Sequence, residues 1–102
     1  MSGYVLSREA DTDLDDLWSY VAEDSVGAAD TLIAKLFDAF ESLARHPDMG
    51  RKREDITQHP VRFWPVGKYL VIYRAELSPI EIVAVGHGMR DIPVFLRLRV
   101  QP

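Results

Sequence analysis

The sequence predicts an α+β domain in which an N-terminal helical hairpin packs on one face of an antiparallel sheet of three or four strands. Three observations lead to this prediction. Two segments in the first half carry apolar residues at helical spacing, three short β-rich segments follow, and the connections between those three are short. Short connections favour antiparallel neighbours, so we expect the order β-α-α-β-β-β within one domain, residues 1–102.

The three C-terminal strands are predicted as a meander. Residues 61–66 form the first strand, which turns at Gly67 and has Pro65 near its end, as suits an edge strand. Residues 69–74 form the second, which starts with five successive apolar positions and should be central and covered on both faces. Residues 80–85 form the third. Its alternation predicts one face made of Ile80, Ile82 and Ala84, and another made of Glu81, Val83 and Val85.

Residues 3–6 are expected to add a strand at the edge of the sheet, and two helices follow. The first helix, residues 8–23, begins at Ser7, whose hydroxyl can accept a hydrogen bond from a backbone N–H two or three residues on. Residues 24–27 are expected to end the first helix. The second helix spans residues 28–45 and stops before Pro47. Apolar periodicity predicts that these side chains are largely buried: Leu17, Trp18, Val21, Leu36, Phe40, Val71 and Ile72.

Residues 47–59 form the longest irregular connection and contain a basic cluster, Arg51-Lys52-Arg53. The cluster is interpreted either as a solvated loop or as a contact for phosphate or carboxylate groups. After the meander, Arg90 and Asp91 are expected to form a structural corner, and a helical turn should begin near Pro93.

Composition limits the classes of protein that need to be considered. The chain has 102 residues, of which 47% are apolar and 27% charged, which is typical of one soluble domain. Cysteine is absent, so disulfides and thiolate metal sites are excluded. The three histidines, His46, His59 and His87, lack paired metal-ligand spacing, and no cofactor motif occurs. No apolar run has the length of a membrane span and no secretory segment is evident, so we expect a cytoplasmic protein.

The net charge of −4 conceals a division between the two halves of the chain. Residues 1–50 carry three basic and eleven acidic side chains, which gives −8, whereas residues 51–102 carry nine basic and five acidic ones, which gives +4. A face that binds an acidic partner should therefore lie on the C-terminal half. The acidic half is interpreted as a solvated surface.

Three segments resemble the ParE branch of the RelE/ParE toxin superfamily across nearly the whole chain. They are HPDMGRKRED after the second helix, VRFWPVGKYLVIYR across the first hairpin, and IEIVAVGHGMRDI at the end. The resemblance implies a toxin of a bacterial type II toxin–antitoxin pair, neutralised by a cognate ParD-like antitoxin in a hetero-oligomer. ParE toxins are associated with poisoning DNA gyrase, whereas RelE relatives cleave mRNA on the ribosome.

The same fold hosts both activities, so the residues have to distinguish them. If the protein is a nuclease, the candidate catalytic groups are His87, Arg62, Arg74 and Arg90, with Tyr73 as a further possibility. His87 lies between two glycines, and the preferred interpretation is a structural one. A ribosome-dependent nuclease should be strongly basic, yet the sequence pI is about 5.2. We therefore prefer a non-enzymatic toxin that inhibits DNA gyrase; an mRNA endonuclease and a degenerate, non-toxic homologue are the alternatives.

Candidate partner-binding residues come from the basic half of the chain. Trp64 and Arg62 alternate with Val61 and Phe63, which places them together on the face of that strand where exposure is expected. An antitoxin segment that folds on binding should combine apolar anchors with charge pairing to the basic cluster. Direct nucleic-acid or membrane binding is not expected. The candidates are Arg51, Lys52, Arg53, Arg62 and Trp64.

Overall fold

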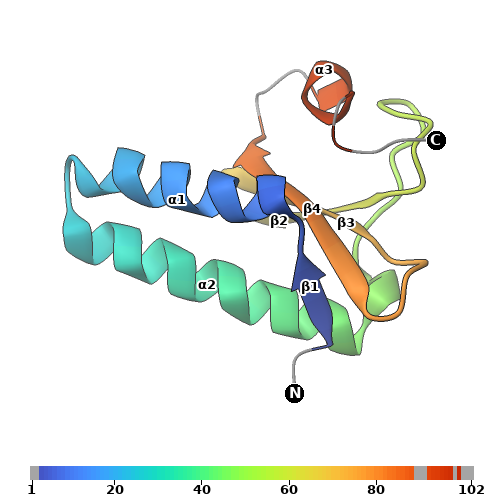
Figure 1. Ribbon diagram of the computed structural model, residues 1–102, viewed down its shortest axis with the longest axis horizontal. Helices are drawn as coiled ribbons and strands as arrows, with labels where there is room; N and C mark the ends of the chain where they lie inside the picture. The colour runs from blue at the N-terminus through green and yellow to red at the C-terminus, as the bar shows by residue number, and fades with distance from the viewer. Residues whose placement is uncertain (1–2, 89–91, 98, 100–102) are drawn as a thin grey trace.

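A helical hairpin lies on one side of a four-stranded sheet, and a short helix lies on the other, in the computed structural model of residues 3–88, 92–97 and 99 (Figure 1). The predicted order of elements is confirmed. The elements are β1 (Tyr4–Leu6), α1 (Arg8–Ala22), α2 (Val26–Arg45), the 3-10 helix η1 (Pro47–Met49), β2 (Arg62–Val66), β3 (Tyr69–Arg74), β4 (Ile80–His87) and α3 (Ile92–Leu96).

Serine caps begin both long helices. The Ser7 hydroxyl accepts from the Ala10 amide at 3.0 Å, and the Ser25 hydroxyl accepts from the Ala28 amide at the same distance. Each bond satisfies a backbone donor that the first helical turn leaves unpaired. Because Ser25 is the cap, α2 begins two residues before the predicted start at residue 28, and Gly27 lies in its first turn instead of in a break.

The strands are ordered β1-β4-β3-β2, so β3 and β4 are internal. The β2–β3 and β3–β4 pairs are antiparallel, as predicted, and Gly67 turns between β2 and β3 with a φ of 60°. β1 pairs parallel to β4, which makes the sheet mixed. The parallel pair is possible because the two long helices, and not a tight turn, follow β1.

A β-bulge changes which side chains of β4 face the helices. Ile72 pairs with Ala84 and the next residue, Tyr73, pairs with Ile82, so Val83 is the extra residue. Ile80, Ile82 and Val85 face the helical hairpin, while Val83 and Ala84 face the other way. The strict alternation predicted for residues 80–85 is therefore wrong from Ala84 onward.

The sheet has a hydrophobic core on each face. The core toward the hairpin includes Leu36, Phe40, Val71 and Tyr73. The opposite core includes Phe63 and Ile72 and is covered by Ile92 and Leu96 of α3. The central strand β3 is thus covered on both sides, as predicted, and the helical turn expected near Pro93 is confirmed.

Burial of the first helix differs from the prediction. Leu36, Phe40, Val71 and Ile72 are buried as expected, whereas Leu17 and Val21 are half-buried. Trp18 is 37% exposed, so its assignment to the core was wrong. In Figure 1 the loop end of the hairpin extends beyond the sheet, so within the described residues the sheet does not cover the C-terminal end of α1. Among the described residues, no helix is long and apolar enough to span a membrane.

Candidate functional site

A buried tyrosine holds the irregular connection that follows α2. The Tyr73 hydroxyl donates to the Pro47 carbonyl at 2.6 Å and accepts from the Gly50 amide at 2.9 Å. A Cβ at Gly50 would lie only 2.5 Å from that hydroxyl, so a glycine is needed for the close approach. Burial raises the pKa of Tyr73, which keeps the hydroxyl protonated as a donor. The connection therefore starts from a defined position on β3.

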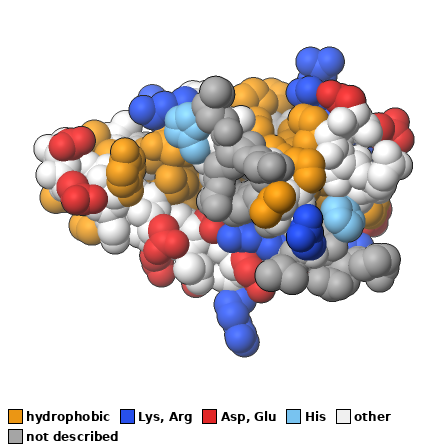
Figure 2. Space-filling view, turned by 90° about the horizontal axis from the view of Figure 1, so that it is seen from above, with side chains coloured by type: hydrophobic (Ala, Val, Ile, Leu, Met, Phe, Trp, Pro, Cys, Tyr) orange, Lys and Arg blue, Asp and Glu red, His pale blue; other side chains and the backbone are white. Residues whose placement is uncertain are grey.

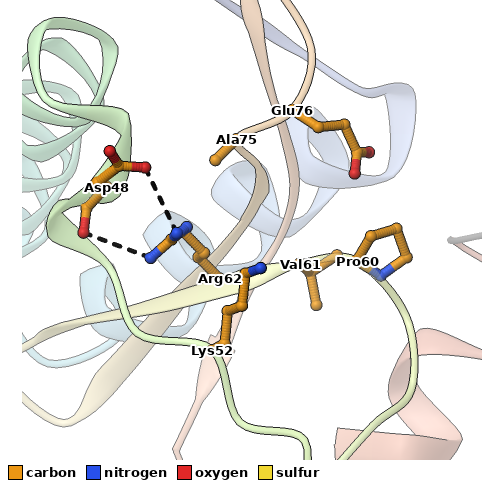
Figure 3. Close-up of a pocket in the computed structure, with 7 residues that line it drawn as sticks. All are labelled: Asp48, Lys52, Pro60, Val61, Arg62, Ala75 and Glu76. Atoms are coloured by element: carbon orange, nitrogen blue, oxygen red, sulfur yellow. Dashed lines mark hydrogen bonds and ion pairs between the residues drawn. The ribbon is translucent and has the colours of Figure 1, made fainter.

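This connection, β2 and the turn after β3 border a hollow of about 190 Å³. Figure 3 shows Arg62 and Lys52 at the centre of the hollow, with Asp48 on one side and the apolar residues Val61 and Pro60 on the other. The lining residues are Asp48, Lys52, Pro60, Val61, Arg62, Ala75 and Glu76. Lys52, Pro60 and Val61 also line a neighbouring hollow of similar volume along the same loop. Two predicted partner-binding residues, Lys52 and Arg62, thus line one site.

Arg62 is fixed by backbone groups more than by its acidic neighbour. Its Nη1 donates to the Gly50 carbonyl at 2.8 Å and lies 3.4 Å from the Asp48 carbonyl. Its Nη2 lies 3.4 Å from a carboxylate oxygen of Asp48, whose side chain is 94% exposed, against 22% for Arg62. An ion pair this long with an exposed partner contributes little to stability. The guanidinium is therefore held in place while its charge is weakly compensated.

The predicted basic cluster does not act as a unit. Arg53 makes two hydrogen bonds to the Asp55 carboxylate, and this pairing lowers the pKa of Asp55. Arg51 pairs through its backbone with Phe63 and leaves its side chain exposed. Lys52 makes no hydrogen bond or ion pair within the described part of the chain, and it alone of the three lines both hollows.

Trp64, the remaining predicted partner-binding residue, is half-buried. It shares its face of β2 with Arg62, as predicted, but this face looks toward the hairpin, and Trp64 packs on the core there. The residues that alternate with it, Val61 and Phe63, are buried against the core on the opposite face. Both faces of β2 are thus largely covered.

The residues that would be catalytic if the protein were a nuclease do not form one cluster within the described part of the chain. His87 pairs with Tyr69 at one end of β3, and Arg62 pairs with Tyr73 at the other. Those two tyrosines are four positions apart, or about 13 Å along β3 at the strand rise. Arg74 is also at the Tyr73 end, where it forms an ion pair with Glu76 at 2.9 Å. Arg90 and Asp91 lie outside the described residues.

His87 is exposed and packs edge-to-face on Tyr69, with ring centroids 5.8 Å apart. The hollow beside it is lined by two carboxylates, from Asp13 and Asp16. The Arg99 guanidinium compensates Asp13, but the Asp16 carboxylate would repel a phosphate bound beside His87. No group of acidic, histidine or cysteine side chains suited to a metal occurs in residues 3–88, 92–97 and 99.

An apolar groove with an acidic rim lies between the two long helices. It has a volume of about 180 Å³ and is lined by Asp11, Leu14, Asp15, Trp18, Ile33 and Phe37. Trp18 and Phe37 are each 37% exposed, and the Trp18 indole donates to the Asp30 carboxylate at 2.8 Å. In Figure 2 the end of the hairpin, at the left, carries acidic side chains without basic ones. Exposed aromatic side chains with such a rim suit a partner that carries apolar and basic groups.

Sequence reasoning missed one buried ion pair. Asp13, on α1, accepts from the Val85 amide at 3.0 Å, just after the β4 bulge. Both of its oxygens are also bonded by the Arg99 guanidinium, with one contact at 2.9 Å. The position of Asp13 on α1 could have indicated its burial. Asp13 directly precedes Leu14 and lies three residues after Ala10, so it is on the same buried side of the helix.

Comparison with solved structures identifies the fold. A solved structure described as the chromosomal ParDE TA system from P. aeruginosa has the same fold, with a TM-score of 0.70 and 19% identity, covering 85% of this chain and 96% of that one. The chain therefore shares its fold with a component of a ParDE TA system.

Sequence similarity gives the family. The family described as ParE toxin of type II toxin-antitoxin system, parDE, matches residues 4–92. Toxin ParE1 of Caulobacter vibrioides (strain ATCC 19089 / CIP 103742 / CB 15) is 35% identical over 88 residues, which is 85% of this chain and 90% of that protein. The chain belongs to the ParE family, the toxins of parDE type II toxin–antitoxin systems.

Proposed function

We propose that the protein inhibits DNA gyrase and that a cognate ParD-like antitoxin neutralises it by binding across the helical hairpin. Membership of the ParE family identifies the class of toxin, and DNA gyrase is the target associated with the ParE branch of the RelE/ParE superfamily. The observation that favours gyrase over mRNA is the separation of His87 from Arg62 and Arg74 along β3. RNA cleavage requires a proton-transfer group and phosphate-binding cations at one scissile bond, whereas the strand pairing places His87 and these arginines at opposite ends of β3.

The antitoxin contact is proposed at the groove between α1 and α2. Trp18 and Phe37 are each 37% exposed within the described part of the chain and offer aromatic surface, and Asp11 and Asp15 line the same groove. An amphipathic antitoxin segment with apolar anchors and flanking Lys or Arg side chains matches both features. The relative in P. aeruginosa is described as part of a ParDE system, which agrees with a partner of this kind.

The target is tested with purified toxin in two parallel assays. One contains gyrase and supercoiled plasmid, and the other contains ribosomes programmed with a defined mRNA. We expect trapped gyrase–DNA cleavage complexes that disappear when antitoxin is added, and we expect them to persist with His87→Ala. Codon-positioned mRNA cuts that are lost in His87→Ala, with gyrase unaffected, would refute the proposal. Inactivity in both assays, with no growth defect on expression, would identify a degenerate homologue.

The antitoxin groove is tested by isothermal titration of toxin variants with the antitoxin encoded by the neighbouring reading frame. Trp18→Ala should weaken binding about 30-fold, the effect of losing an interface anchor worth ~2 kcal/mol. Tyr20→Ala is the matched control, because Tyr20 is on the same helix and 71% exposed, yet does not line the groove. Equal binding by both variants would place the antitoxin elsewhere.

A further inference from the structure

We propose that the hollow at the start of β2 binds a carboxylate side chain of an acidic protein segment. Lys52 and Arg62 would hold the carboxylate, and Asp48 is the internal counter-ion that the incoming group displaces. This inference is independent of the gyrase assignment and of the groove between α1 and α2, because other side chains form the hollow.

The guanidinium of Arg62 is prepared for a carboxylate. Its Nη1 is held at 2.8 Å by the Gly50 carbonyl, and Gly50 is itself anchored to the buried Tyr73 hydroxyl. Binding therefore costs little additional side-chain entropy. The side chain is 22% exposed, so a charge pair formed there is screened less than one on the open surface. A planar guanidinium also matches the geometry of a carboxylate.

Both cations have capacity for a further anion. Lys52 is exposed and makes no hydrogen bond or ion pair within residues 3–88, 92–97 and 99. The nearest acid to Arg62, Asp48, is 3.4 Å from Nη2 and 94% exposed, so it can turn into solvent at low cost. Figure 3 shows Asp48 at the margin of the hollow, with Lys52 and Arg62 side by side. An incoming carboxylate would thus replace a weak pair with a two-cation contact.

Size and wall chemistry favour a single amino-acid side chain. The volume of about 190 Å³ is below the ~300–1,000 Å³ of pockets that enclose whole small-molecule ligands. Pro60, Val61 and Ala75 form an apolar wall that can pack against the methylene groups of Asp or Glu. The hollow therefore fits one acidic side chain that projects from a larger partner.

A nucleic-acid backbone fits this surface less well. Asp48 and Glu76 line the hollow itself, and the neighbouring hollow adds Glu54. Successive phosphates would meet these carboxylates, whereas one protein carboxylate needs to displace only Asp48.

The partner must enter through its side chain, because the outer edge of β2 offers little for an added strand. The Val61 amide donates to the His59 carbonyl at 2.8 Å. Phe63 exchanges both of its backbone bonds with Arg51, at 2.8 and 2.9 Å. Pro65 has no N–H to donate. The outward donors of this edge are therefore occupied or missing, which blocks the pairing used when a peptide extends a sheet.

The test is fluorescence anisotropy of a labelled peptide of alternating Glu and Ala residues, titrated with the full chain at low ionic strength. Lys52→Gln should weaken binding about two- to fivefold, the range for loss of one exposed charge contact. Asp48→Asn should strengthen binding by a similar factor because the internal competitor is removed. The matched control is Lys68→Gln, which removes an exposed lysine at the other end of β2, beyond Gly67, and should leave affinity unchanged.

Three outcomes would overturn the inference. One is an equal loss in Lys52→Gln and Lys68→Gln, which would indicate nonspecific charge attraction. Another is Asp48→Asn binding no more tightly than the parent chain. The third is a single-stranded oligonucleotide of equal charge that binds more tightly and responds to the same variants. A Gln-Ala peptide tests whether the carboxylate is required, and thermal unfolding of every variant checks that all remain folded.

Discussion

The hydroxyl of Tyr73 accepts a hydrogen bond from the Gly50 amide at a site where any side chain larger than that of glycine would meet the tyrosine ring. This contact links the central strand β3 to the segment that carries Asp48 and Lys52. The candidate carboxylate site therefore depends on a buried residue that does not line it.

Replacement of Tyr73 by Phe should lower the free energy of unfolding by about 1–3 kcal/mol at pH 7, because the buried Gly50 amide and Pro47 carbonyl lose a partner. Urea unfolding of both proteins measures the difference. A change below about 0.5 kcal/mol, as at ordinary surface sites, would show that water replaces the hydroxyl.

The stabilising effect of Tyr73 should depend on pH. Burial raises its pKa above the ordinary value of 10.0, so the folded state favours the neutral hydroxyl. The contribution is complete below pH 10 and is lost as the pH rises through the folded-state pKa. The stability difference between the parent chain and Tyr73→Phe should hence stay constant near neutrality and shrink above pH 10. A difference that grows at high pH would contradict the direction of the shift.

Gly50→Ala should destabilise the fold by about 1–3 kcal/mol through overpacking. The added Cβ would lie 2.5 Å from the Tyr73 hydroxyl and 2.6 and 2.9 Å from two ring carbons. Combining it with Tyr73→Phe should relieve only part of the cost, since the ring contacts remain. Gly27→Ala is the control, because a Cβ there would meet only the Ser25 hydroxyl, at 3.8 Å. Full additivity of Gly50→Ala and Tyr73→Phe in denaturant unfolding would argue against their direct contact.

Asp13→Asn should cost about 3–5 kcal/mol, because it leaves the Arg99 guanidinium without its buried carboxylate partner. Asp15→Asn on the same helix is exposed and should change stability by less than about 0.5 kcal/mol. A double-mutant cycle with Arg99→Gln isolates the pair. No coupling between the two sites would mean that Asp13 acts only through the Val85 amide.

Phe40→Ala should lower stability by about 3–5 kcal/mol, since the ring is fully buried between the hairpin and the sheet. Phe37→Ala removes the neighbouring ring, which packs edge-to-face on Phe40 at 5.5 Å but is 37% exposed, and should cost clearly less. Equal effects in thermal unfolding would overturn the assignment of Phe40 to the core.

Local patterns determined most of the architecture. Ser7 caps α1 through a residue only three positions away, and Gly67 turns between adjacent strands. The apolar run of β3 correctly indicated a strand covered on both faces. Such features depend on backbone geometry over a few residues, so one sequence is sufficient to recognise them. The same patterns, with their order along the chain, supported the family assignment that the comparisons confirm.

Tertiary packing decided what local periodicity could not. Trp18 has the spacing of a core residue, yet it is exposed because the hairpin extends beyond the sheet. Asp13 is buried against partners that lie 72 and 86 residues away in the sequence, and local periodicity does not reveal such partners. The β4 bulge and the distance between His87 and Arg62 likewise follow from strand pairing. The physical reason is common to all of them: burial and charge compensation depend on which distant segments meet, and those contacts form only when the sheet and the hairpin pack together.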